Sequence, residues 1–288
     1  LHASGDVGVL GDLLREEDGA EASQRERLAS WKNSLERILG GPVTGYRSTG
    51  RGRISNNTMG ALRSAGYRYF VPDSISRRMV PDIMGFPYET LISIGVTARS
   101  DRDIFDLSPG ESPEFRTMFF QEDVTRVAYE GGLYNLVYSA DGLARPENRE
   151  VLGTLVRSLK EQNFWIAAGD TITHWWRLRQ GINVDVKQRG PHRIVMSISN
   201  NNGATSQALA VTLALGRPVE GVHIQPELIG IGGTADVPKA ILKGDNSELV
   251  LIIEHLKPQQ DRIFHIDLID ADSRRITQGE SRPGTQGE

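Results

Sequence analysis

Apolar residues recur at helical spacing in four stretches of the first 181 residues. In the clearest stretch, "EASQRERLASWKNSLERILGG", Leu28, Trp31 and Leu35 lie three or four residues apart, as residues on one face of a helix do. Gly40 and Gly41 follow and favour the end of that helix. The same spacing predicts further helices over 56–65, 147–162 and 170–181.

Short apolar runs lie between these helices and predict strands. The runs are "TGYRS", "YRYFV", "YNLVYSA" and "FWIAAG". Residues 72–115 are rich in Pro, Gly, Ser and Asp, and we expect a long, mostly irregular insertion there, with one short strand around "TLISIGV". Strands that alternate with helices indicate a parallel sheet or a barrel.

After Gly181 the period of the apolar positions changes from helical to alternating. "INVDVKQ", "HRIVMSISN", "QALAVTLAL", "ELVLIIEHL" and "RIFHIDLID" each read as a half-buried strand. This pattern predicts an antiparallel β-sandwich over 182–272, and the polar, glycine-containing residues 273–288 predict a disordered tail. Residues 1–181 then form a separate α/β domain.

Composition narrows the class of protein. Of 288 residues, 38% are hydrophobic and 24% charged, which is typical of a soluble globular chain. The net charge of −4, with scattered basic residues, argues against a nucleic-acid partner. No apolar run has the length of a membrane span. The chain has no cysteine, which excludes disulfides, thiolate metal sites and a cysteine nucleophile.

Two groups of residues suggest acid or metal chemistry. His2 and Asp6 form H-x-x-x-D, a pair that can bind a divalent metal or can be ordinary surface residues near a terminus. Asp101, Asp103 and Asp106 lie in the predicted insertion. They can supply acidity to a site, and the alternative is that all three are solvated loop carboxylates.

Arg47 and a tryptophan pair are the other candidates. Arg47 follows a predicted strand, and active sites of parallel α/β folds gather at the carboxyl ends of strands. An arginine there can hold a catalytic carboxylate through a bidentate pair. Trp175 and Trp176 either stack on sugar rings or anchor the last helix of the first domain.

Several of these stretches together resemble the polysaccharide deacetylases, the carbohydrate esterases that share the chitooligosaccharide-deacetylase homology domain. "GYRSTGRGRISNNTMGALRSAGYRYFVPDS" is similar to their third motif, and "ASQRERLASWKNSLERILGGPVTGYR" to the helix and loop before it. "GGLYNLVYSADGLARPENREVLGTLVRSLKEQNFWIAAGDTITHWWRLR" is similar to their closing segment. The resemblance covers roughly residues 1 to 181.

The resemblance implies a distorted (β/α) barrel that carries a metal-dependent hydrolase. Such enzymes remove acetyl groups from cell-wall or capsular polysaccharides with a divalent metal, usually zinc, that polarises the acetyl carbonyl and activates water. In this chain His2 and Asp6 take the places of the metal pair, and Arg47 takes that of the arginine that orients the catalytic base. Trp175, Trp176, Tyr138 and Ser139 take substrate-contacting places.

The departures from the family pattern are equally specific. The paired aspartates of the first motif would precede residue 1, so we expect a barrel that lacks its first strand or strands and a chain that is a fragment. Tyr138 and Ser139 stand where the family has a histidine acid, and tyrosine titrates near 10.

The sequence therefore predicts a secreted or cell-envelope protein that binds polysaccharide or oligosaccharide. One hypothesis is a deacetylase-like hydrolase acting on carbon–nitrogen bonds of N-acetylated glycan, impaired in this chain. A second hypothesis is an inactive glycan-binding or scaffold protein with the same fold. A third is a barrel that deacetylates with other residues, which lie in the long insertion.

Overall fold

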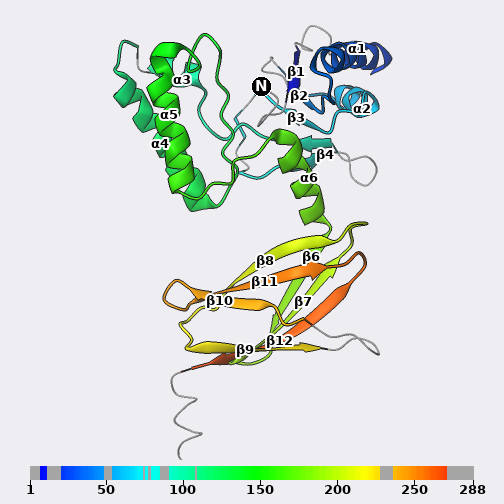
Figure 1. Cartoon of the computed structure of the whole chain (residues 1–288), viewed down its shortest axis with the longest axis vertical. Coiled ribbons are helices and arrows are strands. Elements are labelled where there is room, and N and C mark those ends of the chain that lie inside the picture. Colours follow the sequence, from blue (N-terminus) through cyan, green and yellow to red (C-terminus); the bar gives the residue numbers. More distant parts are fainter. Residues whose placement is uncertain are drawn as a thin grey trace, which may run out of the picture. The chain divides into compact units, whose positions relative to one another are not determined.

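The computed structural model of the protein describes residues 7–11, 21–48, 54–73, 75–76, 79–84, 91–107, 109–227 and 236–270. The chain divides into two compact units, Leu1–Trp176 and Arg177–Glu288. Figure 1 labels their helices and strands. The division falls inside a helix, α6 (Gly169–Gln180), whereas the sequence pattern changes after Gly181.

The first unit is built around a sheet of mostly parallel strands. Its order is β1-β2-β3-β5-β4, in which β1, β2, β3 and β5 run parallel and β4 is antiparallel to β5. The strands are β1 (Gly8–Gly11), β2 (Gly45–Ser48), β3 (Tyr69–Val71), β4 (Asp82–Met84) and β5 (Leu91–Ser93). The helices are α1 (Glu21–Leu39), α2 (Asn56–Ser64), α3 (Asp101–Leu107), α4 (Pro113–Glu130), the short 3-10 helix η2 (Pro146–Asn148), α5 (Arg149–Glu161) and α6.

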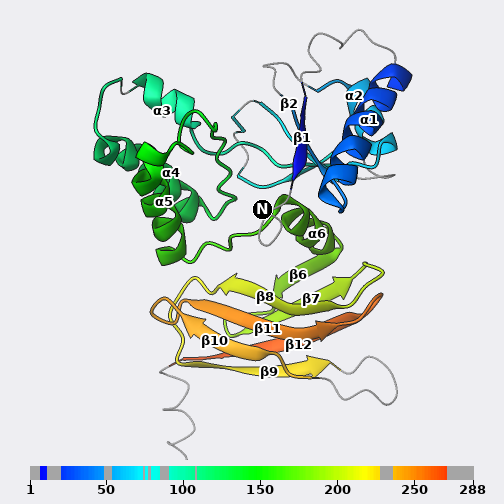
Figure 2. The same ribbon diagram turned by 45° about the horizontal axis from the view of Figure 1, so that its top comes forward.

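Helices α1 and α2 cover one face of this sheet, as both views of the ribbon show (Figure 2). Val9, Tyr46 and Phe70 point from three neighbouring strands into a core that Leu28 of α1 and Leu62 of α2 complete. Because successive side chains of a strand point to opposite faces, Arg47 faces away from these helices. The alternation of apolar residues thus decides which side of the sheet is open for a site.

A second core holds α3, α4 and α5 together. Ile104, Phe120, Val124, Leu143 and Val151 are buried in one cluster. The first residues of α4 follow a clear start signal, because the Ser112 hydroxyl accepts a hydrogen bond from the Phe115 N–H and Pro113 occupies the first turn.

The expectation of a mostly irregular insertion over 72–115 holds in part: β5 lies in the predicted short strand, but β4, α3 and the start of α4 were not predicted. Helix α3 begins with a reciprocal cap: the Asp103 carboxylate accepts from the Ser100 N–H, and the Ser100 hydroxyl accepts from the Asp103 N–H. The polar residues Ser100 and Asp103, which suggested a loop, in fact cap the start of this helix.

Two predicted strands are absent from the part of the chain that the structure describes. Residues 132–139 and 164–168 have no ladder partner. In the first segment the carbonyl of Asn135 accepts from the Thr97 N–H, and the Asn135 N–H donates to the Thr97 hydroxyl. These bonds to a neighbouring loop replace strand pairing.

The second unit consists of two antiparallel sheets. One has the order β6-β7-β12-β9 and the other β10-β11-β8. The strands are β6 (Ile182–Gln188), β7 (Arg193–Asn200), β8 (Ser206–Ala214), β9 (Gly221–Glu227), β10 (Lys239–Lys243), β11 (Glu248–Leu256) and β12 (Asp261–Ile269). Five of them match the predicted strands, and β9 and β10 were not predicted.

Both sheets contribute to one hydrophobic core. Met196 and Phe264 come from the four-stranded sheet, and Leu249 and Leu251 come from the three-stranded one. The alternating burial along β7 and β12 follows directly from the alternating sequence. The prediction of an α/β part with parallel strands, followed by separate antiparallel strands, is confirmed. The tail 273–288 lies outside the described residues.

None of the helices that the structure describes has the length and apolar character needed to cross a membrane.

Candidate functional site

Arg47 and Asp73 form an ion pair at the carboxyl ends of two neighbouring strands. Arg47 is the third residue of β2, and Asp73 comes two residues after β3 ends. Nη2 of Arg47 donates to Oδ1 of Asp73 at 2.9 Å. Because β2 and β3 are parallel, their carboxyl ends bring the two side chains to one edge of the sheet.

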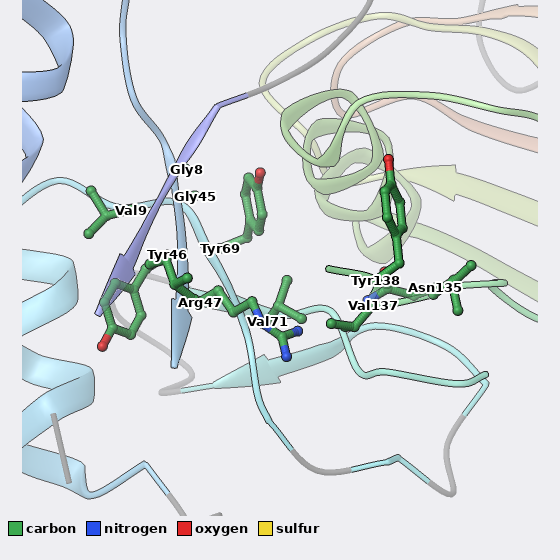
Figure 3. A pocket seen from close by; sticks show the side chains of 12 residues that line it. Gly8, Val9, Gly45, Tyr46, Arg47, Tyr69, Val71, Asn135, Val137 and Tyr138 are labelled. Carbon is green, nitrogen blue, oxygen red and sulfur yellow. The ribbon is translucent and has the colours of Figure 1, made fainter. Parts of the chain in front are cut away.

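A pocket of about 380 Å³ lies on the open face of the sheet beside Arg47. Residues of β1, β2 and β3 form one side of it, and residues 135–138 form the other. Figure 3 shows the Arg47 side chain extending from β2 toward the segment that carries Val137, while Tyr46 points to the opposite side of the sheet. Gly8 and Gly45 line the pocket without a side chain and leave it room.

The electrostatics of Arg47 have two opposing causes. Burial lowers the pKa of its guanidinium, and the Asp73 carboxylate beside it raises that pKa. Among the described residues, Nη1 of Arg47 is buried and has no hydrogen-bond partner. An unmatched buried donor costs about 1–3 kcal/mol, so this N–H is available to an acceptor on a ligand.

The opposite wall of the pocket is fixed by Asp101. Its Oδ2 accepts hydrogen bonds from the Ser139 N–H at 2.9 Å, the Ser139 hydroxyl at 3.0 Å and the Leu143 N–H at 2.9 Å. This carboxylate lies so close to Gly142 that a Cβ at that position would clash with it. Asp101 is 2% exposed, so its interpretation as a solvated loop carboxylate was wrong, whereas Asp103 and Asp106 are exposed.

The structure places Tyr138 and Ser139 differently, although they are neighbours. Tyr138 is half exposed and lines the pocket together with Arg47. The Ser139 hydroxyl is committed to Asp101. Of the two residues at the place where the family has a histidine acid, only Tyr138 therefore offers its side chain to a ligand in this pocket.

The two predicted tryptophans also differ. Trp176 is 6% exposed and lies in a core cluster with Tyr69, Ile92 and Ile94. Trp175 is 47% exposed, and its ring centroid lies 5.9 Å from that of Trp165 in an edge-on contact. The Trp175 ring also lies 5.9 Å from the Trp176 ring, so Trp175 is a partly exposed member of a group of three tryptophans, and Trp176 anchors α6.

The predicted metal ligands His2 and Asp6 lie outside the described residues. Within the described ranges, no group of three or more His, Asp or Glu side chains is placed to hold a metal ion.

Sequence reasoning missed Asp73, the partner of Arg47. The sequence "YFVPDS" contained an indication of it, because an acidic residue there follows a buried strand. The carboxyl ends of neighbouring parallel strands lie at one edge of the sheet, so such a residue can reach Arg47. Sequence reasoning also missed Asn135, which is one of the residues that line the pocket (Figure 3).

Comparisons with known proteins give matches only among solved structures. No protein-family model matches the chain, and no curated protein sequence matches it. A protein classified as a polysaccharide deacetylase from Mycobacterium smegmatis matches with 17% identity and a TM-score of 0.48, over 57% of this chain and 59% of that one. A second protein of that class, from Pseudomonas aeruginosa PAO1, matches with 17% identity and a TM-score of 0.46, over 55% of this chain and 54% of that one.

An allantoinase matches with 17% identity and a TM-score of 0.47, over 58% of this chain and 56% of its own. The matched region spans less than two thirds of the length of each of these structures. The sequence indicated a resemblance to polysaccharide deacetylases over roughly residues 1 to 181, and two of these matches, each over part of the chain, are to proteins of that class.

Proposed function

We propose that the first unit belongs to a deacetylase-like hydrolase that removes acetyl groups from N-acetylated glycan. The observation that carries the proposal is the Arg47–Asp73 pair beside a pocket at the carboxyl ends of parallel strands. The pocket offers a hydrogen-bond donor on Arg47 and apolar walls from Val71 and Val137. These suit a carbonyl oxygen and a methyl group, the two ends of an acetyl group.

The proposal includes a divalent metal, with His2 and Asp6 as two of its ligands. A bound zinc ion would polarise a carbonyl and activate water. The contribution of Arg47 is independent of it: its Nη2 fixes the position of the Asp73 carboxylate, while Nη1 is left for the substrate.

The same proposal covers the finer architecture, the partners and the location. The parallel sheet would belong to a distorted (β/α) barrel. The two antiparallel sheets would form a β-sandwich around their shared core. The partner would be a polysaccharide at the cell envelope or outside the cell, with Trp175 stacking on sugar rings.

One observation favours a second candidate, an inactive glycan-binding protein with this fold. The Ser139 hydroxyl is held by Asp101, and Tyr138 replaces the family's histidine. A phenol is a weaker general acid at neutral pH than the imidazolium of a histidine. Under this candidate the pocket binds acetylated sugar without cleaving it.

The test measures acetate released from an N-acetylated oligosaccharide, with and without added zinc. The Arg47→Ala variant is expected to lower the rate by about 10²-fold or more, because both the Asp73 position and the spare donor are lost. The Arg193→Ala variant removes an arginine–aspartate pair of the second unit and serves as the matched control.

Zinc-dependent release that Arg47→Ala abolishes and Arg193→Ala leaves unchanged supports the hydrolase. Absence of release from a zinc-loaded sample rules it out for this chain. Binding of the same oligosaccharide without release, weakened by Arg47→Ala, supports the glycan-binding candidate.

A further inference from the structure

Four strands lie at the edges of the two antiparallel sheets that the structure describes. They are β6 and β9 in one sheet, and β8 and β10 in the other. An edge strand presents unpaired N–H and C=O groups that another strand can join. Natural proteins therefore interrupt their edges with proline, lysine, irregular backbone or short strands.

Three of these edges carry such an interruption. Strand β9 contains Pro226, which has no N–H to give to a further strand. Strand β8 contains Ala208 with a φ of 51°, a backbone conformation that breaks the regular edge. Strand β10 has only five residues, and Lys239 and Lys243 stand at its two ends.

Strand β6 also carries a lysine, Lys187, but that lysine forms an ion pair with Asp185 of the same strand, and β6 has none of the other features. It runs regularly over Ile182–Gln188, with every residue paired to β7 and no proline in it. Val184 and Val186 are 41% and 44% exposed. They pair with Ile198 and Met196, which are buried, so both valines stand on the core side of the sheet at its rim. The open edge of β6 is therefore regular, and it is apolar on the face that carries Val184 and Val186.

The other face of β6 carries two opposite charges. Asp185 and Lys187 flank Val186 and form an ion pair of 2.8 Å along the strand, with both side chains mostly exposed. Such an exposed pair contributes little to stability within one chain. The acidic Asp185 precedes Val186 and the basic Lys187 follows it. In an antiparallel copy this order is reversed, so opposite charges of the two strands would face each other.

We propose that β6 is a self-association edge, which pairs antiparallel with β6 of a second copy of this chain around a two-fold axis at Val186. In this register Asp185 of each copy lies opposite Lys187 of the other, and the two Val186 side chains meet on the opposite face. Directly opposed residues of unlike charge stabilise an antiparallel pair, and a two-fold axis uses each contact twice. The four-stranded sheet then continues from one copy into the next.

The experiment is sedimentation of the full chain over a range of concentrations, with two single variants. Asp185→Lys places two lysines opposite each other, and Lys187→Asp places two aspartates opposite each other. Each variant is expected to weaken dimerisation by on the order of tenfold. An equimolar mixture of the two variants restores attraction at both contacts and is expected to dimerise at least as tightly as the unchanged chain.

Glu130→Lys and Lys160→Asp, exposed substitutions in the helices of the first unit, are the charge-matched controls and should change neither the dimer nor the mixture. Far-UV circular dichroism confirms that each variant is folded. A chain that stays monomeric at all concentrations overturns the proposal, and the β6 edge could then pair only with a strand of another protein. A dimer that both variants tolerate, or a mixture that remains monomeric, also overturns it.

Discussion

A single carboxylate, that of Asp101, fixes the loop that forms one wall of the pocket. It lies in the first turn of α3, and its Oδ2 accepts three hydrogen bonds from Ser139 and Leu143. Composition alone placed it in a loop, because a polar stretch gives no indication of which carboxylate will be buried. Arg47 was predicted, since a strand end is visible in sequence. Its partner Asp73 was not, because pairing across parallel strands depends on register.

Asp101→Ala is expected to lower the free energy of unfolding by about 3 kcal/mol, because it leaves buried donors of Ser139 and Leu143 without an acceptor. Urea denaturation measures the change. Asp106→Ala, an exposed aspartate of the same helix, should stay within about 0.5 kcal/mol of the unchanged chain. Equal losses in the two variants would contradict the role given to Asp101.

Glu36 gives a prediction for pH. Hydrogen bonds from Lys32 and from the Val43 N–H lower the pKa of its carboxyl group. Because the folded pKa is below the unfolded one of about 4.3, the stabilisation is present above that pH and is lost as pH falls through the folded pKa. Glu36→Gln should therefore cost below about 1 kcal/mol at neutral pH, and the difference from the unchanged chain should vanish in acid. A difference that grows in acid would have the wrong sign.

At the scale of elements, the sequence predicted those that keep one regular period and missed those that depend on local signals. Helices α1, α2, α5 and α6 and five of the strands were recognisable from spacing alone. Helices α3 and α4 begin at Ser100 and Ser112 caps within a polar stretch, and β9 and β10 are interrupted or short. Residues 132–139 form no strand, because backbone N–H groups of this segment donate to the side chains of Thr97 and Asp101. The spacing of apolar residues gives no indication of such bonds.

Two glycines in helices should respond to alanine in opposite directions. Gly153 in α5 has nothing within 4 Å of a Cβ, so Gly153→Ala should stabilise the protein by roughly 0.5–1 kcal/mol through helix propensity. Gly169, at the start of α6, would place a Cβ 2.5 Å from the Tyr69 hydroxyl, so Gly169→Ala should destabilise it by about 1–3 kcal/mol.

Thermal unfolding of both variants measures the contrast. Tyr69→Ala should destabilise Gly169→Ala less than it destabilises the unchanged chain, because it removes the hydroxyl and the ring atoms that the new Cβ meets. Equal losses from Tyr69→Ala in the two backgrounds would contradict the steric explanation.

At the scale of the whole molecule, the chain behaves as two units with cores of their own. Among the residues that the structure describes, thirteen buried ones form the core cluster of the second unit, and the clusters of the first unit consist of residues up to Trp176. The change of hydrophobic period after Gly181 predicted the change from helices with parallel strands to antiparallel strands, since a sheet face and a helix face have different repeats.

Differential scanning calorimetry is expected to resolve two transitions. Phe264→Ala should shift only the transition of the second unit, and Phe120→Ala only that of the first, each by the equivalent of about 3–5 kcal/mol. Expression of residues 177–270 alone gives the complementary measurement, because it should reproduce the Phe264-sensitive transition. One transition that both variants shift together would show that the units unfold as one.

The division of the chain after Trp176 also separates its chromophores. All four tryptophans and all seven tyrosines precede residue 177, so the second unit has phenylalanine as its only aromatic side chain. Intrinsic fluorescence therefore reports on the first unit alone, without any label. A glycan that quenches this fluorescence must act on the first unit. Unfolding of the β-sheets of the second unit should leave the fluorescence intensity unchanged.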